Sequence, residues 1–162
     1  MKTIKFLLLI AGGTMFLSAA PASAGYAAGS KLSLAITCPT HAASDPTFSF
    51  ILTNQGSDPV DVDDTYLPID LMVHLTVKDA SGNVVTPGTY ISGSRHPAAS
   101  RVLEPGQSVV LKDWVDHTQP QTSVIPIHLF GYQLSAGTYQ VSAKATDSPD
   151  EPRSNVCTVV VN

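Results

Sequence analysis

The chain has 162 residues, a length that suits one folded domain and leaves little room for a two-domain enzyme. Hydrophobic residues make up 43% and charged residues 14%, which is far from the composition of chains that stay disordered. Thirteen acidic against nine basic residues give a net charge of -4, so the chain lacks the basic surface that nucleic acid or anionic lipid would require.

The first 24 residues have the organisation of a secretory signal peptide. Two lysines precede a mostly apolar run, Phe6–Leu17, and small residues ending at Ala24 follow it. This run is shorter than the roughly 20 apolar residues that cross a bilayer, which disfavours a membrane anchor. We therefore expect cleavage after Ala24, a secreted or periplasmic location, no membrane insertion, and one domain over residues 25–162.

Export changes the meaning of the two cysteines, Cys38 and Cys157. In an oxidising compartment an even pair is typical of a disulfide, and this pair would make the first and last strands neighbours. The alternative is a reactive or metal-binding thiol pair, for which neither a C-x-x-C motif nor a histidine close in sequence is present. We predict the Cys38–Cys157 disulfide.

Short runs of alternating apolar and polar residues, the period of a strand with one buried face, begin the mature chain. In its first half we predict strands at 32–37, 47–53, 60–62, 71–77 and 84–85. Pro39 ends the first of them, and turns at 54–59 and 78–83 separate the later ones, the second turn closing a hairpin.

The second half continues this pattern after an irregular stretch over 90–100. A tight turn at 102–107 leads to a strand at 108–115, and further strands are predicted at 139–143 and 155–161. The least regular segments should be those rich in Pro, Ser and Gly, at 25–30, 92–100, 119–126 and 148–154. Helical spacing is absent, so the predicted fold is all-β, an immunoglobulin-like antiparallel β-sandwich of about seven strands.

Four segments place turn residues in a characteristic succession: Phe50-x-Leu52-Thr53-Asn54-x-Gly56-x-x-Pro59-Val60, Val77-x-Asp79-x-x-Gly82, Leu103-x-Pro105-Gly106-x-Ser108 and Ala136-Gly137-Thr138-Tyr139-x-Val141. This succession resembles bacterial immunoglobulin-like domains over most of the mature chain. More narrowly, it is similar to the intracellular proteinase inhibitor type of bacilli and to the domain that precedes the catalytic unit of some secreted metallopeptidases. The resemblance implies a noncatalytic module and transfers no functional residue.

Acidic residues are concentrated in the first half of the chain, at Asp58, Asp61, Asp63, Asp64 and Asp70. Calcium takes six to eight oxygen ligands, so a calcium site is one interpretation of this cluster. The other is a solvated edge, because alternation along a strand places Asp61 and Asp63 on one face and charged edges resist aggregation. The closing glutamate of an EF-hand loop is absent, and we favour the solvated edge.

Catalytic and metal-binding motifs are absent from the sequence. The histidines at 41, 74, 96, 117 and 128 form no zinc motif, and His74 is expected to point outward or to be hydrogen bonded in the core. No G-x-S-x-G elbow marks a nucleophilic serine. We therefore predict neither enzymatic activity nor a cofactor.

Two aromatic residues stand out. Trp114, the one tryptophan, lies in Asp113-Trp114-Val115-Asp116-His117 and is either a core anchor, the interpretation we favour, or an exposed platform for a sugar or a peptide. Tyr139 opens a late strand, where a tyrosine hydroxyl commonly bonds back to the backbone at a sandwich corner.

Three functional classes remain for such a domain. The first is an exported noncatalytic binding module for a protein partner. The second is an inhibitor or folding assistant of a secreted protease, acting through loops such as 90–100 at one end of the sandwich. The third is an accessory domain that binds carbohydrate or calcium.

Overall fold

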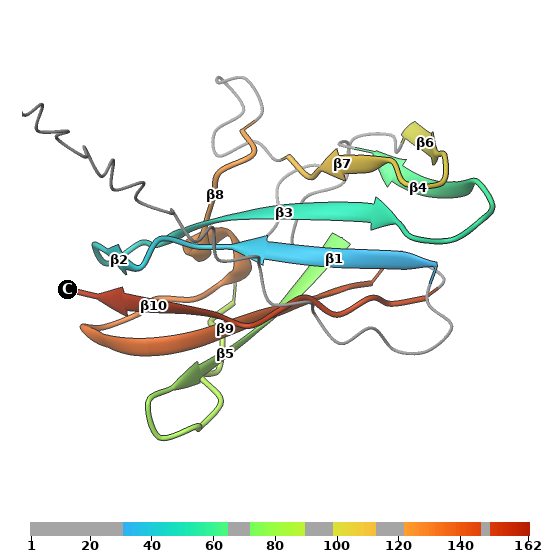
Figure 1. The fold of residues 1–162 in the computed structure, drawn as a ribbon. Helices are drawn as coiled ribbons and strands as arrows, with labels where there is room; N and C mark the ends of the chain where they lie inside the picture. Colours follow the sequence, from blue (N-terminus) through green and yellow to red (C-terminus); the bar gives the residue numbers. More distant parts are fainter. Residues whose placement is uncertain (1–30, 65–71, 90–98, 113–121, 147–149) are drawn as a thin grey trace, which may run out of the picture.

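Two layers of β-strands face each other across one apolar core in the computed structural model, which describes residues 31–64, 72–89, 99–112, 122–146 and 150–162 (Figure 1). The predicted all-β fold class is confirmed. The predicted signal peptide lies outside the described residues. Among those residues no helix is long and apolar enough to cross a membrane.

The first sheet contains β1 (Leu32–Thr37), β3 (Thr47–Asn54) and β7 (Ser108–Val110) in that order, with β8 (Ile125–Pro126) also paired to β3. Leu34 lies opposite Leu52 in the β1–β3 register, and the alternate residues of both strands are buried. The period of two therefore places one face of this sheet in the core, as the sequence predicted.

The second sheet has the order β2 (His41–Ala42), β10 (Cys157–Val161), β9 (Gly137–Ala145) and β5 (Val73–Asp79). The β2–β10 pair is parallel, whereas β10–β9 and β9–β5 are antiparallel. Between β1 and β2 the chain passes Pro39, which has no N–H for a ladder, and changes sheets. The orders β1-β3-β7 and β5-β9-β10 correspond to the two sheets of immunoglobulin-type sandwiches.

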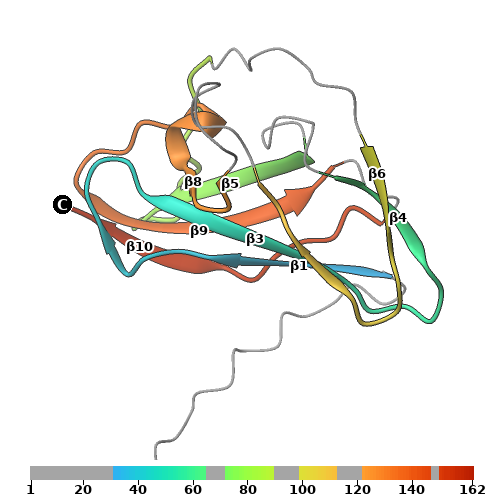
Figure 2. The ribbon, with the colours of Figure 1, turned by 90° about the horizontal axis from the view of Figure 1, so that it is seen from above.

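A third pair, β4 (Val60–Asp64) and β6 (Ala99–Leu103), continues the β3–β7 pair around a corner, and Figure 2 shows it turned across the direction of β3. Asn54 holds this corner. Its fully buried side chain donates to the carbonyls of Asp58 and Leu103, both at 2.8 Å, and accepts from the Gly56 N–H at 2.8 Å. A buried amide with its bonds made costs little and fixes one geometry.

The two ends of the domain are fastened to each other. The predicted disulfide between Cys38 and Cys157 is confirmed, with a Cα–Cα distance of 6.3 Å across a sequence separation of 119 residues. Beside it the Asn155 side chain accepts from the Ile36 N–H and donates to the Ile36 carbonyl, both at 3.0 Å. A disulfide fits a non-reducing environment.

Several boundaries differ from the predictions. The segment 119–126 was expected to be irregular, but Ile125 is fully buried and pairs with Phe48. The strand predicted at 108–115 ends at Val110, and residues 113–115 lie outside the described residues. The segment 150–154 follows β9 through the Lys144–Arg153 bridge.

The described residues also hold more strands than the seven expected. Strands as short as β2 and β8 leave no periodicity in a sequence. The five-residue strand β6 occupies positions that were predicted to be an irregular stretch ending at residue 100 and the beginning of the turn at 102–107, so that prediction is wrong there.

Candidate recognition surface

The predicted acidic cluster is open on β4 where its side chains are described. Asp61 is exposed opposite Val102, and the side chains of Asp63 and Asp64 are not among those that the structure describes. Asp58 lies 3.6 Å from the Lys31 ammonium group. Within the described part of the chain, no three His, Cys, Asp or Glu side chains gather to hold a metal ion.

Of the two predicted aromatic positions, the structure describes Tyr139. The Tyr139 hydroxyl donates to the Ser135 carbonyl at 3.1 Å, so the predicted sandwich corner is confirmed. Trp114 lies outside the described residues, as do Asp70 and most of the loop over 90–100. The core and platform interpretations of Trp114 both stay predictions.

The described surface has an extended, exposed segment at residues 84–89, directly after the β5 hairpin. Val84 is 63% exposed, and every later residue except Val85 is exposed. Its two hydrogen bonds to the body of the domain run from the Val85 N–H to the Val77 carbonyl at 2.9 Å and from the Gly88 N–H to the Gly131 carbonyl at 2.7 Å. Thr86 and Pro87 lie between these two fixed points.

The turn that precedes the segment is held by Asp79. Its carboxylate accepts from the backbone N–H of Ser81 at 2.8 Å, and from the backbone N–H and side-chain amide of Asn83 at 2.9 and 3.1 Å. The bond from the Asn83 side chain is the main reason why the pKa of Asp79 lies below its ordinary value. Gly82 completes the turn at a φ of 84°.

The far end of the segment crosses the chain at a second glycine. A short 3₁₀ helix, η1 (Ile127–Phe130), ends at Gly131, which has a φ of 79°. A Cβ atom at Gly131 would lie 2.6 Å from the Gly88 carbonyl oxygen. Only glycine therefore allows the two backbones to approach so closely. Phe130 anchors η1 in the core by an edge contact with Phe50 at a centroid distance of 5.7 Å.

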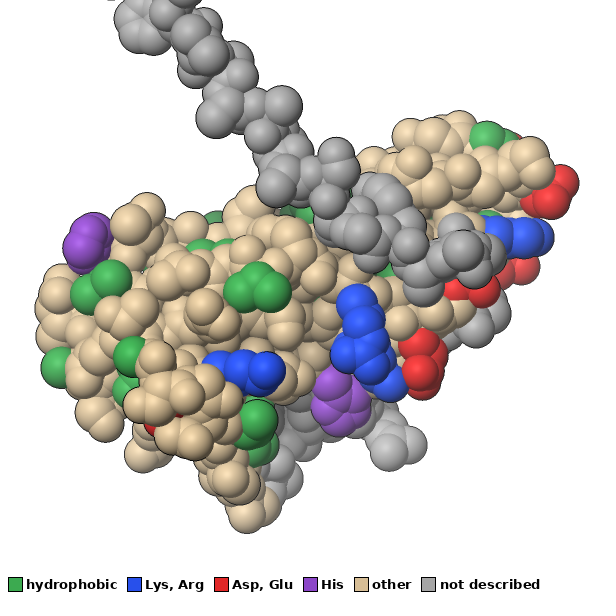
Figure 3. Space-filling view, turned by 60° about the horizontal axis from the view of Figure 1, so that its bottom comes forward, with side chains coloured by type: hydrophobic (Ala, Val, Ile, Leu, Met, Phe, Trp, Pro, Cys, Tyr) green, Lys and Arg blue, Asp and Glu red, His purple; other side chains and the backbone are tan. Residues whose placement is uncertain are grey.

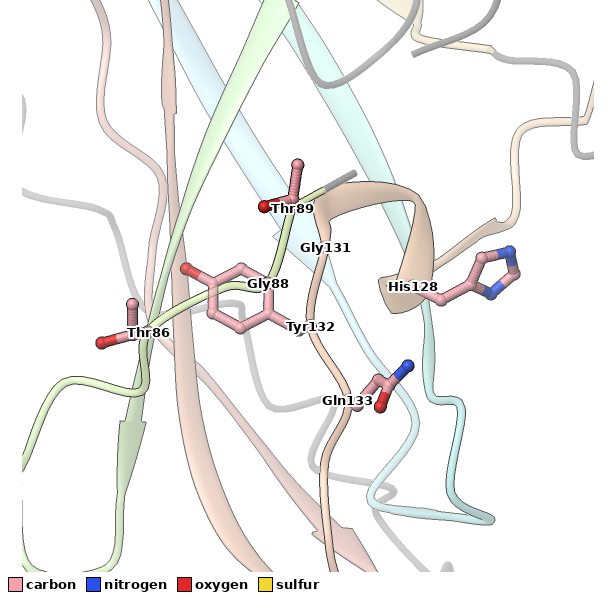
Figure 4. Close-up of a pocket in the computed structure, with 7 residues that line it drawn as sticks. All are labelled: Thr86, Gly88, Thr89, His128, Gly131, Tyr132 and Gln133. Carbon is pink, nitrogen blue, oxygen red and sulfur yellow. The ribbon is translucent and has the colours of Figure 1, made fainter. Parts of the chain in front are cut away.

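A hollow of about 390 Å³ lies beside this crossing (Figure 4). Its lining residues come from the extended segment and from the chain that follows η1, namely Thr86, Gly88, Thr89, His128, Gly131, Tyr132 and Gln133. A smaller hollow of about 200 Å³ adjoins it along β5, and Gly88 and Tyr132 line both. Tyr132 is buried and its hydroxyl donates to the Leu75 carbonyl at 3.0 Å. Burial raises the pKa of Tyr132.

His128 borders the hollow and is oriented by Asp45. The imidazole Nδ1 lies 2.7 Å from Asp45 Oδ2, and the His128 backbone N–H donates to Asp45 Oδ1 at 3.2 Å. In Figure 4 the imidazole points away from the Tyr132 ring. No described serine, threonine or cysteine side chain is hydrogen bonded to this imidazole. The arrangement of the Asp45–His128 pair fixes the position of η1.

The sequence carried only a weak signal for this surface. Thr86-Pro87-Gly88 follows a predicted hairpin and indicates that the strand ends, but nothing local indicates that Gly88 meets Gly131. The histidine at 128 was noted without a partner, because Asp45 is distant in sequence.

Comparisons with known proteins give little for this chain. No protein family model and no curated protein sequence matches it. Among solved structures, it is similar to the β-glucuronidase of Bacteroides uniformis, with 10% sequence identity and a TM-score of 0.31 over 78% of this chain. The match spans 12% of the length of that enzyme.

Proposed function

We propose that the chain is an exported, noncatalytic immunoglobulin-like module that binds a protein partner through the segment 84–89. The observation that carries this proposal is that the segment is exposed while its backbone is hydrogen bonded to the rest of the domain at two points. Val84 is 63% exposed, whereas the backbone of the same segment is fixed at Val85 and Gly88. The terminal disulfide supports the exported location.

Fixation matters because a loop that is already ordered loses little conformational entropy when it binds. The carboxylate of Asp79 orders the turn on one side, and the Gly88–Gly131 crossing orders the other. The segment also presents the exposed aliphatic side chain of Val84 and, further along, Thr86, Gly88 and Thr89, which line the larger hollow. The segment therefore combines low entropic cost with apolar and polar contact groups.

The second candidate is an inhibitor of a secreted protease. It is favoured by one observation, that an extended and exposed strand of chain is held on both flanks, which is the form in which a protease cleft accepts a polypeptide. Pro87 follows Thr86 in this segment, and a proline lacks the N–H that an extended chain would offer there. Incubating the mature chain with a panel of secreted proteases tests this candidate, because an inhibitor must slow at least one enzyme while remaining intact.

The test of the main proposal uses a photoactivatable amino acid at position 84 of the mature protein. Exposed to the secreted proteins of its own source, the labelled chain should form one dominant covalent adduct. The matched control carries the same label at Val102, which is 50% exposed on β6 in a different part of the fold. Adducts of equal yield and identity from both positions would refute recognition by this segment. An adduct yield that stays unchanged when unlabelled wild-type protein competes would also refute it.

A second variant separates contact from folding. Val84→Lys places a charge at the exposed position, and the same change at Val102 is the control. We expect the first to weaken partner binding at least tenfold and the second to leave it within twofold, with unchanged urea midpoints for both. A Val84→Lys protein that binds as tightly as the parent would contradict the proposal.

A further inference from the structure

The outer face of the second sheet has a row of basic side chains that the segment 84–89 does not involve. His74 on β5 lies directly opposite Lys144 on β9, and Lys144 lies directly opposite Arg153 on the chain that precedes β10. Residues directly opposite each other on adjacent strands project from the same face of a sheet. Figure 3 shows basic side chains grouped on this face beside a histidine and an acidic side chain.

The two cations of this row are held at the closest cross-strand spacing. Hydrogen bonds from the Ala145 N–H to the Pro152 carbonyl and from the Ser154 N–H to the Ala143 carbonyl flank the Lys144–Arg153 pair. The pair therefore occupies a non-hydrogen-bonded position, where opposing side chains come nearest. Like charges directly opposite each other are unfavourable in a sheet, so this arrangement calls for a compensating anion.

Among the described residues, the carboxylate of Glu151 supplies part of that compensation. Glu151 Oε2 lies 2.9 Å from Lys144 Nζ, and the pKa of Glu151 is lowered first by Lys144 and also by Arg153. To reach Lys144, the Glu151 backbone adopts a φ of 42°, a left-handed conformation that is uncommon for residues other than glycine. Among the described residues no hydrogen-bond acceptor contacts the exposed Arg153 guanidinium.

We propose that this row, formed by His74, Lys144 and Arg153, binds a carboxylate-bearing segment of a protein, that is, an acidic peptide stretch. A guanidinium group binds a carboxylate in two-point geometry, and Arg153 is the cation of this row that no described side chain binds. The chain as a whole has a net charge of -4, whereas this row is basic. An acidic partner would therefore be attracted to the row and not to the rest of the surface. Glu151 occupies Lys144 and directs the incoming carboxylate to Arg153.

The test uses the mature protein and a hexaglutamate peptide at low ionic strength, with hexaglutamine as the uncharged control. Arg153→Gln should weaken hexaglutamate binding at least tenfold. Lys78→Gln removes the same charge from the same strand as His74 but outside the row, and it should change binding less than twofold. Added salt should weaken binding to the parent, because the contacts are exposed.

A second measurement needs no ligand. If Arg153 repels Lys144, the unliganded Arg153→Gln protein should unfold at the same or a higher urea midpoint than the parent at low salt. A lower midpoint would show that Arg153 serves the fold and would overturn the proposal. Equal weakening of hexaglutamate binding by both glutamine variants, no binding by the parent, or tighter binding of a sulfated oligosaccharide than of hexaglutamate would overturn it as well.

Discussion

Replacing both cysteines with serine, Cys38→Ser together with Cys157→Ser, removes the covalent link between the first and last parts of the sandwich. The link spans a sequence separation of 119 residues. For a loop of this size the chain-entropy relation gives a loss of about 4.9 kcal/mol in the free energy of unfolding at 25 °C. Residual structure in the unfolded chain reduces this effect, so we expect a loss of about 3 to 5 kcal/mol.

The variant should still fold at room temperature. A domain of this length has a free energy of unfolding on the order of 7 to 20 kcal/mol at about 0.05 to 0.15 kcal/mol per residue. Urea unfolding followed by far-ultraviolet circular dichroism measures the loss directly. The denaturant slope should also increase, because an unlinked unfolded chain exposes more surface.

The control for this experiment is Asn155→Ala, which breaks a noncovalent link at the same place. Asn155 makes its two bonds to Ile36 only in the folded protein. Its removal should therefore cost about 1 to 3 kcal/mol with an unchanged denaturant slope. A double serine variant within about 1 kcal/mol of the parent, or one whose slope does not change, would refute the unfolded-state argument.

Three further predictions concern single residues. Tyr139→Phe should lower the free energy of unfolding by about 1 kcal/mol, because its hydroxyl bond to Ser135 is lost; an unchanged melting curve would contradict the corner assignment. Asn54→Ala should cost about 2 to 4 kcal/mol in urea unfolding, since it leaves the Leu103 carbonyl buried without its donor. The lowered pKa of Asp79 means that its contribution is present above the ordinary value of 3.8 and is lost as the pH falls through the folded pKa. The protection of the Ser81 and Asn83 amides against hydrogen exchange, relative to their intrinsic rates at each pH, should therefore fall on acidification before that of the Val77 amide does, and an equal fall at all three would contradict this.

Local alternation predicted the long strands well. The even positions of 32–36 and the alternate residues of β3 enter the core as the period of two requires. The disulfide followed from the export signal and an even cysteine pair, neither of which depends on knowing the strand order.

The sequence pattern did not predict which distant segments pair with each other. Ile125, Ile127 and Leu129 lie at every second position, a spacing that also fits one continuous strand. The division of 125–130 into a two-residue strand and a 3₁₀ helix therefore depends on Phe48 and on Gly131. The candidate recognition surface at 84–89 also depends on a contact between segments that are distant in the sequence. Its central feature is the close approach of Gly88 to Gly131. The residues around either glycine give no sequence pattern that predicts this contact.

Three of the sheet edges are poorly suited to pairing with a strand of another chain. At the edge of β1, the Asn155 side chain occupies both the N–H and the carbonyl of Ile36. At the edge of β5, Val85 returns to bond Val77, and the Tyr132 hydroxyl takes the Leu75 carbonyl. β7 is three residues long and is followed by the exposed Lys112, and short or charged edges resist pairing with another chain. The edges at β1, β5 and β7 are therefore unsuited to strand addition, which supports our two proposals that a protein partner binds the segment 84–89 and that an acidic peptide binds the basic row across β5 and β9.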